Sequence, residues 1–501
     1  MDCEIPILSA EEMQRVERIS IREGASEEEY VSRAGLEVAE AALRLLEQKA
    51  LPETVSLMVG KGNNGADALS AGVYLTEKGI NVRAFLFYPS EESSPLCATY
   101  AKRFAHAGGR LNIIEEPSSY FAHEKPEGLI IDGLLGVGLR GRLHEKTEVI
   151  IRAVNALSSP VLSVDIPSGV NGSTGVVDPV AVKATETVFL GALKIGGFIR
   201  DGYEQTGAFS VASFGLEERY LRMARATACM FDEKSIARML PPVIRTRHKY
   251  RTGYLLAVAG SRGMTGAALL SSFAALRSGA GIVRLFHPAG TGGESVNVPW
   301  ELIRSPYDND PGPFFRELRR ASAVMVGPGM GRGEMAEKFV REITPAIRIP
   351  MLIDADALFL LRDSLSSLNA PAVLTPHRGE MLSLLDKPEY GDILAECGEW
   401  ATSVGHIVVV KGAPTFIFRP DALPLIVPSG DPGMATAGTG DVLSGVIAAL
   451  LAQKAPPIDA ATLGVYLHGY AGEQVARKMT SYGMVASDLI EALPGAFKHL
   501  E

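Results

Sequence analysis

The chain has 501 residues, of which 47% are hydrophobic and 21% are charged, and its formal net charge is −9. This length exceeds what one ordinary hydrophobic core can hold, so two or three domains are expected, and the composition is that of a well-packed globular protein. The acidic charge and the lack of a Lys/Arg cluster argue against a nucleic-acid partner.

The sequence also indicates the cellular compartment of the protein. No uncharged run reaches membrane-spanning length, and the N-terminus lacks the basic and apolar regions of a signal peptide, which indicates a cytoplasmic protein without a membrane partner. The cysteines lie far apart and show no zinc-ligand spacing, so neither a zinc site nor a disulfide framework is expected from Cys3, Cys97, Cys229 and Cys397.

The first predicted elements are an acidic helical segment from Ser9 to Glu47, which opens on a capping-box pattern, and a short apolar strand from Val55 to Val59. The strand leads into a glycine-rich turn at 60–65 and a second helical run. Gly-x-Gly-x-x-Gly between strand and helix can hold a phosphate or pyrophosphate on a helix N-terminus, although a simple tight turn fits equally well. The next strand, 82–87, ends in Tyr-Pro rather than an acid, which does not support a standard NAD-binding fold.

Two further strands of the first half, 129–131 and 161–164, are each followed at once by a carboxylate, Asp132 and Asp165. Either residue alone is more often a turn or cap residue. Ligands bind at the carboxyl edge of an open parallel sheet, because the loops from adjacent strands meet there, so several polar loops on one edge favour a site. Hard oxygen ligands that a monovalent cation accepts are supplied by Asn64, Asp132 and Ser168.

A domain boundary is predicted between Gly215 and Arg245, where composition shifts and after which strand–helix alternation restarts. We therefore expect an α/β protein of two domains, 1–225 and 226–501. The glycine loops of the two halves differ in spacing and sequence, so they are not an internal repeat.

The second half contains short apolar strands that end in glycine-rich or polar loops, and helical segments separate most of them. This alternation predicts a parallel sheet wrapped by helices. The segments 414–418 and 424–427 read as an antiparallel hairpin. His377, in one strand-end loop, is either a surface histidine or a ligand contact; Lys411, in another, is either a solvated charge or a phosphate partner.

The most informative stretch is 430–445, where a glycine-rich turn runs into an apolar helix and places Asp441 at the helix start. Flanking glycines allow successive backbone N–H groups to point into one concavity at the positive end of the helix, which forms an anion hole. A carboxylate beside such a hole suits a base that accepts a hydroxyl proton. The competing interpretation is that Asp441 is only the helix N-cap.

These motifs carry a resemblance to known families. The second half resembles the ribokinase-type fold of ATP- or ADP-dependent NAD(P)H-hydrate dehydratases, through Ala-Gly-Ser at 259–261, Thr-Gly-Ala-Ala at 265–268, Val-Gly-Pro-Gly at 326–329, Asp-Ala-Asp-Ala-Leu at 354–358, Thr-Pro-His at 375–377 and the stretch 430–445. The first half resembles the NAD(P)H-hydrate epimerases, through Gly-Lys-Gly-Asn-Asn-Gly at 60–65, Asp132 with its glycine loop, and Val-Asp-Ile-Pro-Ser-Gly at 164–169. Together they follow the order of the bifunctional NAD(P)H-hydrate repair enzymes.

The resemblance implies a Rossmann-like N-terminal sheet and a ribokinase-like C-terminal α/β sandwich. It implies that the first half interconverts the R and S hydrates of NADH and NADPH. The second half would use ADP or ATP, with Mg²⁺, to phosphorylate the added hydroxyl of the S-hydrate, after which phosphate leaves and NAD(P)H is restored. The resemblance also implies a K⁺ ion in the first half and a homo-oligomer.

Site residues follow from the same resemblance. Asp441 would take the hydroxyl proton. The nucleotide would lie along Lys411, Gly412, Ala413, Pro414, Thr415 and Gly440. The hydrate in the second half would contact Ala267, Gly329, His377 and Asp441. The hydrate in the first half would contact Asn63, Asn64, Gly65, Ala66, Asp67, Gly136, Val137, Gly138, Leu139, Arg140, Gly141, Arg142 and Asp165, and potassium would bind Asn64, Asp132 and Ser168.

The chain departs from the family pattern at a few positions. Ala66 and Ala68 stand where the epimerases usually have glycines, which puts two methyl groups where backbone approaches a ligand closely. Arg378 replaces a usual proline and Ala437 a usual glycine, and neither change removes a functional side chain. The alternative function is a vitamin or sugar kinase of the same fold, with a non-catalytic N-terminal binding module.

Overall fold

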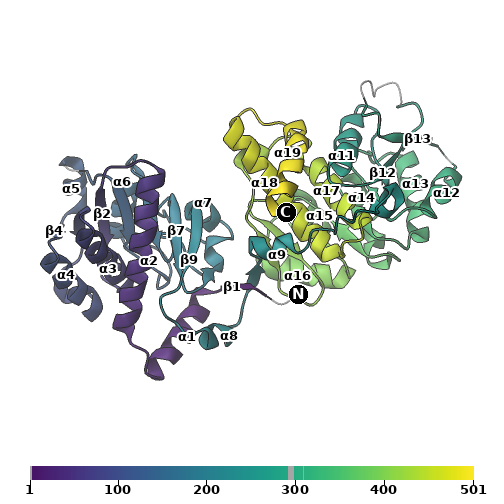
Figure 1. The fold of residues 1–501 in the computed structure, drawn as a ribbon. Helices are drawn as coiled ribbons and strands as arrows, with labels where there is room; N and C mark the ends of the chain where they lie inside the picture. The colour runs from purple at the N-terminus through teal and green to yellow at the C-terminus, as the bar shows by residue number, and fades with distance from the viewer. Residues whose placement is uncertain (1–2, 124, 292–297, 309) are drawn as a thin grey trace. The chain divides into compact units, whose positions relative to one another are not determined.

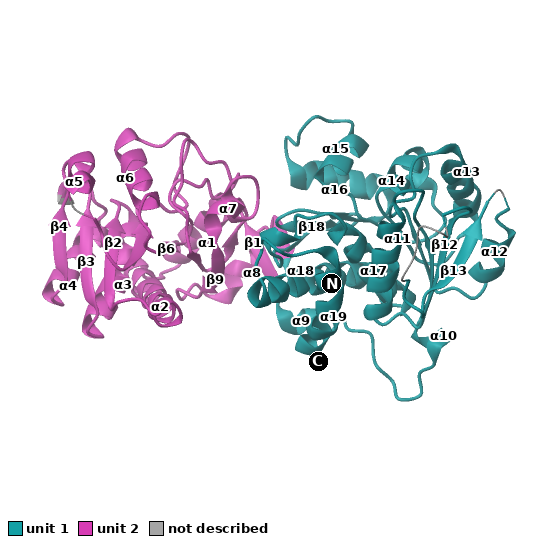
Figure 2. Cartoon of the chain, turned by 90° about the horizontal axis from the view of Figure 1, so that it is seen from above, with its two compact units in different colours: residues 1–4, 230–501 teal, residues 5–229 magenta. Residues whose placement is uncertain are grey.

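The computed structural model describes residues 3–123, 125–291, 298–308 and 310–501. The chain forms two compact units, one of residues 5–229 and the other of residues 230–501 together with the N-terminal residues up to Glu4 (Figure 2). The division at 229/230 falls a few residues after the predicted boundary at 225/226.

The N-terminal unit contains a seven-stranded sheet in the order β4-β3-β2-β5-β6-β7-β9, and every neighbouring pair in it is parallel (Figure 1). The chain runs outward from β2 to β3 and β4 and then returns to β5, so the order reverses between β2 and β5. Such a reversal opens a crevice at the carboxyl ends of the two strands. The strands are β2 (Thr54–Val59), β3 (Asn81–Leu86), β4 (Arg110–Ile113), β5 (Leu129–Gly133), β6 (Val161–Val164), β7 (Glu186–Leu190) and β9 (Ala208–Ala212).

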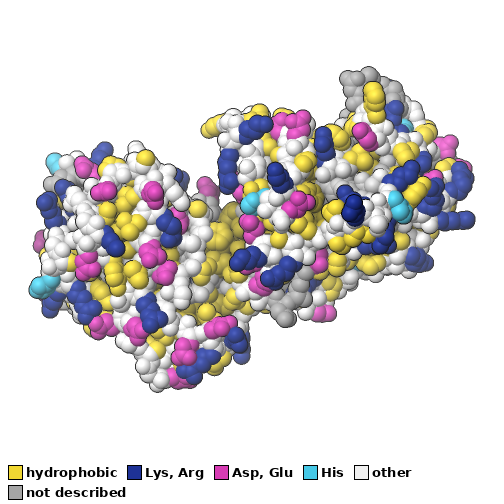
Figure 3. All heavy atoms as spheres, in the orientation of Figure 1, with side chains coloured by type: hydrophobic (Ala, Val, Ile, Leu, Met, Phe, Trp, Pro, Cys, Tyr) yellow, Lys and Arg dark blue, Asp and Glu magenta, His cyan; other side chains and the backbone are white. Residues whose placement is uncertain are grey.

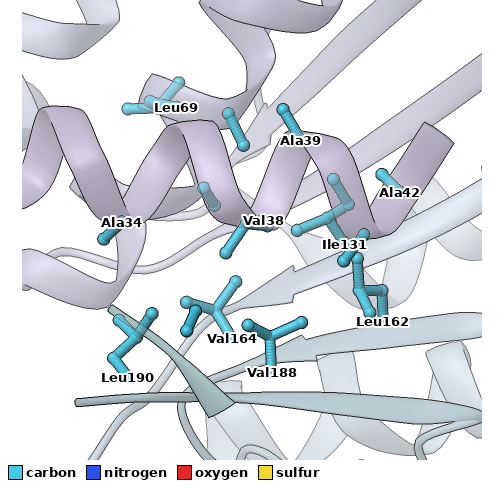
Figure 4. Close-up of a cluster of buried hydrophobic side chains, with 14 of the residues drawn as sticks. Ala34, Val38, Ala39, Ala42, Leu69, Ile131, Leu162, Val164, Val188 and Leu190 are labelled. Carbon is cyan, nitrogen blue, oxygen red and sulfur yellow. The ribbon is translucent and has the colours of Figure 1, made fainter. Parts of the chain in front are cut away.

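Helices cover both faces of this sheet and bury separate apolar clusters. One cluster holds side chains of α2, α3 and α4, and Figure 4 shows α2 laid across β5, β6 and β7 in it; the other cluster holds α5 and α6. The short strands β1 (Ile5–Leu8) and β8 (Leu193–Lys194) pair in parallel. The helices are α1 (Ala10–Arg22), α2 (Glu27–Gln48), α3 (Asn63–Glu77), α4 (Pro95–His106), α5 (Pro117–His123), α6 (Glu145–Asn155), α7 (Gly202–Thr206) and α8 (Glu218–Arg222).

The predicted helical segment 9–47 is two helices rather than one. Ser9 caps the first by accepting a bond from the backbone N–H of Glu12 at 3.1 Å. The break falls at Gly24, whose φ of 105° is open to glycine but costly for other residues, and Ser26 caps the second helix. Strands β1 and β8 were not predicted, because two to four residues are too few to show a period of two.

The C-terminal unit contains strands in the order β13-β12-β11-β14-β15-β16-β17-β18-β19. Pairs from β13 to β17 are parallel, whereas β17, β18 and β19 pair antiparallel, which confirms the predicted hairpin. The strands are β11 (Tyr254–Val258), β12 (Ile282–Pro288), β13 (Ile303–Tyr307), β14 (Ala323–Val326), β15 (Met351–Ile353), β16 (Ala372–Leu374), β17 (Ile407–Val410), β18 (Thr415–Phe418) and β19 (Leu425–Val427), while β10 (Ala228–Met230) lies at the boundary.

The apolar helix predicted after the 430–445 turn is α17, and it lies in the core of this unit. Its Gly445 packs on α11, where an added Cβ would lie 2.1 Å from the Ser271 carbonyl oxygen, so the two helices approach closely. The helices are α9 (Glu233–Ala237), α10 (Lys249–Thr252), α11 (Thr265–Arg277), α12 (Gly312–Leu318), α13 (Glu334–Ile343), α14 (Asp356–Leu360), α15 (Arg378–Leu385), α16 (Ile393–Val404), α17 (Thr439–Ala452), α18 (Pro457–Lys478) and α19 (Ala486–Leu500).

On the face drawn in Figure 3, acidic and basic side chains are interspersed over each unit. Within the described ranges, no helix combines the length and the apolar character that crossing a membrane requires. Cys97 and Cys397 are free and buried. Cys3 and Cys229 are disulfide-bonded, which the wide spacing of the cysteines did not predict.

Candidate functional site

A cavity of about 860 Å³ opens in the N-terminal unit beside the carboxyl ends of β2, β5 and β6. Its size is that of a small-molecule site. Most residues predicted to contact the hydrate line it, namely Asn63, Asn64, Asp67, Gly136, Val137, Gly138, Leu139, Arg140, Arg142 and Asp165. Gly65, Ala66 and Gly141 were also predicted to contact the hydrate, and they are not part of its lining.

The glycine-rich turn 60–65 explains how the cavity forms. A Cβ at Gly60 would lie 1.8 Å from the Leu134 carbonyl oxygen, and one at Gly65 would lie 2.3 Å from the Gly60 carbonyl oxygen, so both glycines permit close packing of this turn. Helix α3 begins after Gly62, and no side chain caps it. Its first N–H groups therefore remain available at the positive end of the helix, on the cavity side.

The two alanines that depart from the epimerase pattern do not narrow the cavity. Ala66 and Ala68 are both fully buried in the apolar cluster between α2, α3 and the sheet. The Ala68 methyl group packs against Gly133 of β5, where an added Cβ would lie 2.5 Å away. The two methyl groups consequently fill the core rather than the ligand space.

The three predicted potassium ligands converge below the cavity. The fully buried Asp132 carboxylate accepts bonds from the Ser168 hydroxyl at 2.6 Å, the Ser168 N–H at 2.9 Å and the Ser163 hydroxyl at 2.9 Å. The Asn64 amide donates to the Leu135 carbonyl at 3.0 Å, and the Ser168 hydroxyl lies 3.0 Å from the same oxygen. Burial raises the pKa of Asp132, and the bonds from Ser168 oppose that rise.

Asp165 is held at the cavity wall by a buried lysine that sequence analysis did not single out. Lys194, whose side chain is 1% exposed, pairs with the Asp165 carboxylate and donates to the Leu190 carbonyl at 2.6 Å. The Leu190 N–H also donates to Asp165, at 3.0 Å. Asp165 has a φ of 68°, an uncommon conformation for a residue with a side chain. These contacts fix one carboxylate oxygen of Asp165.

Two other carboxylates of the cavity lining are half-buried or buried and lack such partners, whereas Glu27, which also lines the cavity, is exposed. Glu17 of α1 is half-buried and Asp67 of α3 is 7% exposed. Within the described part of the chain, neither carboxylate has a hydrogen-bond or ion-pair partner. Burial raises the pKa of Glu17 to about 7. Burial, together with the charges of Asp165 and Glu17, raises the pKa of Asp67 well above its ordinary value. No sequence motif marks Glu17, which lies in an ordinary charged helix.

In the C-terminal unit, Asp441 is in the first turn of α17 but is not its N-cap. The cap residue is Gly438, with φ of 92°, and Asp441 is the third residue of the helix. No hydrogen bond or ion pair joins the Asp441 carboxylate to any described residue. Burial raises the pKa of Asp441 to about 6, Asp354 and Glu380 add to the rise, and Lys411 opposes it. The capping interpretation is therefore wrong, and an unpartnered carboxylate stands at the positive end of α17.

An ion pair with the buried Asp354 holds Lys411 beside the N-terminus of α17. Its Nζ lies 2.7 Å from Asp354 Oδ1, and the Ser444 hydroxyl donates to Asp354 Oδ2 at 2.6 Å. Only 2% of the Asp354 side chain is exposed. A Cβ built on Gly440 would lie 3.5 Å from Lys411 Nζ, so the ammonium stands beside the N-terminus of α17. Lys411 is thus a partly buried partner of the buried Asp354 rather than a solvated charge.

The remaining predicted residues of this unit fall into two groups. Residues 411–414 form the turn between β17 and β18, and Thr415 begins β18. The backbone of Lys411 forms a bridge with that of His377, which is the N-cap of α15. Ala267 and Gly329 form the second group, because a Cβ on Gly329 would lie 2.7 Å from the Ala267 Cβ. Both groups lie in loops at the carboxyl ends of parallel strands or at the helix starts that follow them.

The fold is that of an α/β enzyme, with a candidate site at the carboxyl ends of parallel strands in each unit. A family model described as NAD(P)H-hydrate dehydratase matches residues 255–495, and one described as YjeF-related protein N-terminus matches residues 27–196. The C-terminal unit is also similar to a crystal structure of a ribokinase-like superfamily protein from Enterococcus faecalis V583, with 27% identity and a TM-score of 0.51, over 54% of this chain and 95% of that one.

Similarity to curated relatives extends over both units. The bifunctional NAD(P)H-hydrate repair enzyme of Moorella thermoacetica is 32% identical over 93% of this chain and 92% of its own length. The enzyme of the same name from Escherichia coli K12 is 33% identical over 91% of this chain and 88% of its own length. The chain belongs to the family of bifunctional NAD(P)H-hydrate repair enzymes, which joins an epimerase to a nucleotide-dependent dehydratase. This confirms the predicted fold and function and decides against the kinase alternative.

Proposed function

We propose that Asp441 is the general base of the dehydratase and that the N-terminus of α17 holds the transferring phosphoryl group. The observation that carries this assignment is a carboxylate without a partner among the described residues, with a pKa raised by burial to about 6, beside free helix N–H groups. Near neutral pH such a carboxylate is ionised yet basic enough to accept a hydroxyl proton. The hydroxyl oxygen then attacks the terminal phosphorus of ADP or ATP, and the phosphate ester formed is a good leaving group.

Lys411 and the turn 411–415 would hold the nucleotide. The Lys411 ammonium stands beside Gly440 and can approach phosphate oxygens while Asp354 fixes its position. Mg²⁺ would arrive with the nucleotide and neutralise phosphate charge. The residues fit that role because carboxylates gather here, although no group of three His, Cys, Asp or Glu residues suited to a metal cage occurs in the described part of the chain. Ala267, Gly329 and His377 would contact the hydrate.

In the N-terminal unit, the cavity would bind the hydrate for epimerisation, with Asp165 at its wall and the start of α3 facing the pyrophosphate. Asn64 and Ser168 both donate to the Leu135 carbonyl, and Ser168 also donates to Asp132; the oxygen atoms of these three side chains are of the kind that K⁺ accepts. A bound K⁺ would order the loop after β5 and offset the charge of the buried Asp132 carboxylate. Gly65, Ala66 and Gly141 would act through the backbone of the same loops.

The full chain would act in the cytoplasm as a homo-oligomer on small molecules, hydrated NADH and NADPH with ADP or ATP. One experiment tests the assignment of activities. Purified full-length protein is incubated with a mixture of R and S hydrates and with ADP, ATP or no nucleotide, while NAD(P)H absorbance and the two epimers are followed. We expect complete conversion only with nucleotide. Conversion that stops when the S-hydrate is consumed would show an inactive N-terminal unit.

A further inference from the structure

The cavity of the N-terminal unit is lined by two buried or half-buried carboxylates to which no chemical step has been assigned above. Glu17 projects from α1 and Asp67 from α3, and both line the cavity. Asp67 is more than nine-tenths buried, and neither carboxylate has a hydrogen-bond or ion-pair partner among the described residues. Leaving a buried carboxylate without a partner costs stability, so such a group in a ligand cavity points to chemistry with the ligand.

The chemistry required here is inversion at one ring carbon. The carbon that carries the added hydroxyl lies next to the ring nitrogen, because water adds to the enamine double bond at the carbon whose positive charge the nitrogen lone pair can stabilise. Exchange of the two epimers at this carbon can proceed by loss of the hydroxyl and return of water to the opposite face. That sequence needs an acid for the departing oxygen and a base for the incoming water.

We propose that Asp67 and Glu17 are the acid and the base of this exchange, an inference that rests on the epimerase activity proposed above. The Asp67 carboxyl gives its proton to the departing hydroxyl as the C–O bond breaks and the nitrogen lone pair forms a C=N⁺ bond. A water oxygen then forms the new C–O bond on the other face, and its proton passes to the Glu17 carboxylate. In the reverse direction the two groups exchange roles, and cavity water returns the proton between turnovers.

The surroundings of the two carboxyl groups raise the pKa of both. Glu17 faces Lys194 of β8, Asp165 after β6, Glu27 of α2 and its neighbour Arg18, in addition to Asp67 of α3. Lys194 and Arg18 lower the pKa of Glu17, whereas burial and the two acids raise it, to about 7. Asp67 is buried more deeply, and burial together with the nearby charges of Asp165 and Glu17 raises its pKa well above the ordinary value, which favours its protonated form.

This arrangement predicts how the rate of catalysed epimerisation depends on pH. Catalysed epimerisation should rise as pH increases through about 7, because Glu17 must lose its proton to act as the base. It should fall again at higher pH as Asp67 ionises. Loss of the hydroxyl in solution depends on solvent acid and slows steadily as pH rises, so the uncatalysed blank has the opposite slope around neutrality.

The test uses full-length protein and measures exchange between purified epimers without nucleotide, corrected for the blank. Glu17→Gln and Asp67→Asn should each lower the catalysed rate by about 10²- to 10⁴-fold while hydrate affinity and melting temperature stay near wild type. The matched control is Glu40→Gln, an exposed carboxylate of α2 outside the cavity lining, which should leave the rate unchanged. Glu17→Gln should also abolish the rise of rate with pH.

Wild-type protein alone gives a second test that does not depend on the folding of variants. In ¹⁸O-labelled water, each inversion should place a solvent oxygen on the product. Retention of the original oxygen would overturn the proposed sequence, and so would a rate within about three-fold of wild type in Glu17→Gln. No exchange above the blank in wild type would instead refute the epimerase activity itself.

Discussion

Replacement of Asp441 by asparagine separates catalysis from stability more sharply than any other change in the C-terminal unit. The side chain keeps its size and loses only its ability to ionise. Since the carboxylate makes no hydrogen bond to a described residue and Gly438 is the cap, the variant breaks no bond that holds α17. A positioned general base contributes about 10²- to 10⁴-fold to rate, so we expect dehydration to fall by that factor while nucleotide affinity changes little.

The stability effect can be worked out from the pKa of Asp441. A rise from the ordinary 3.8 to about 6 corresponds to a cost of up to about 3 kcal/mol at neutral pH, at 1.36 kcal/mol per pH unit. Loss of a negative charge at the helix N-terminus offsets this by about 0.3–1 kcal/mol. Because the folded-state pKa is raised, wild type loses stability as pH rises from about 4 through about 6, and the asparagine variant does not.

The assay therefore compares urea denaturation at pH 4 and pH 8 with turnover and nucleotide titration on the same preparation. Asp441→Asn should be as stable as wild type at pH 4 and more stable, by up to about 2–3 kcal/mol, at pH 8. Wild-type turnover should rise with pH to a plateau above about 6 as the carboxylate ionises. Turnover of the variant within a few-fold of wild type would refute the role of Asp441 as base.

Three further predictions concern other parts of the two sites. Asp132→Ala should slow epimerisation and abolish its response to potassium while dehydration continues, as a potassium titration of epimer exchange would show; an unchanged response would remove Asp132 from the site. Lys411→Met should weaken nucleotide binding and lower the free energy of unfolding by about 3–5 kcal/mol, because it leaves the nearly fully buried Asp354 without its cation. Near-native stability of the variant in urea would contradict this effect on stability. Gly329→Ala should raise the KM for the hydrate and lower the melting temperature, because the φ of Gly329 is 58° and the new Cβ would lie 2.7 Å from the Ala267 Cβ. The control is Gly333→Ala, because the space around Gly333 is open.

Local pattern was enough to place much of the architecture. A short apolar run followed by a glycine-rich turn and a helical run fixes a strand, its carboxyl end and the helix start that follows. Ligand loops gather at the carboxyl edge of parallel strands, so the sequence could place Asp132, Asp165 and Lys411 at strand ends and make them candidate site residues before their neighbours were known. The antiparallel ending at β18 and β19 followed from the same reasoning, because short strands separated by a turn pair locally.

Contacts between segments distant in sequence decided the rest. Whether Asp441 caps its helix depends on the backbone of Gly438, and whether Ala66 and Ala68 obstruct the ligand depends on which side of α3 meets the sheet. Neither property can be deduced from the 3.6-residue helical periodicity of the sequence. Glu17 and Lys194 are ordinary charged residues in the sequence. They become parts of a site only because α1 and β8 pack beside a cavity that α3 also lines, where burial rather than local sequence raises the pKa of Glu17.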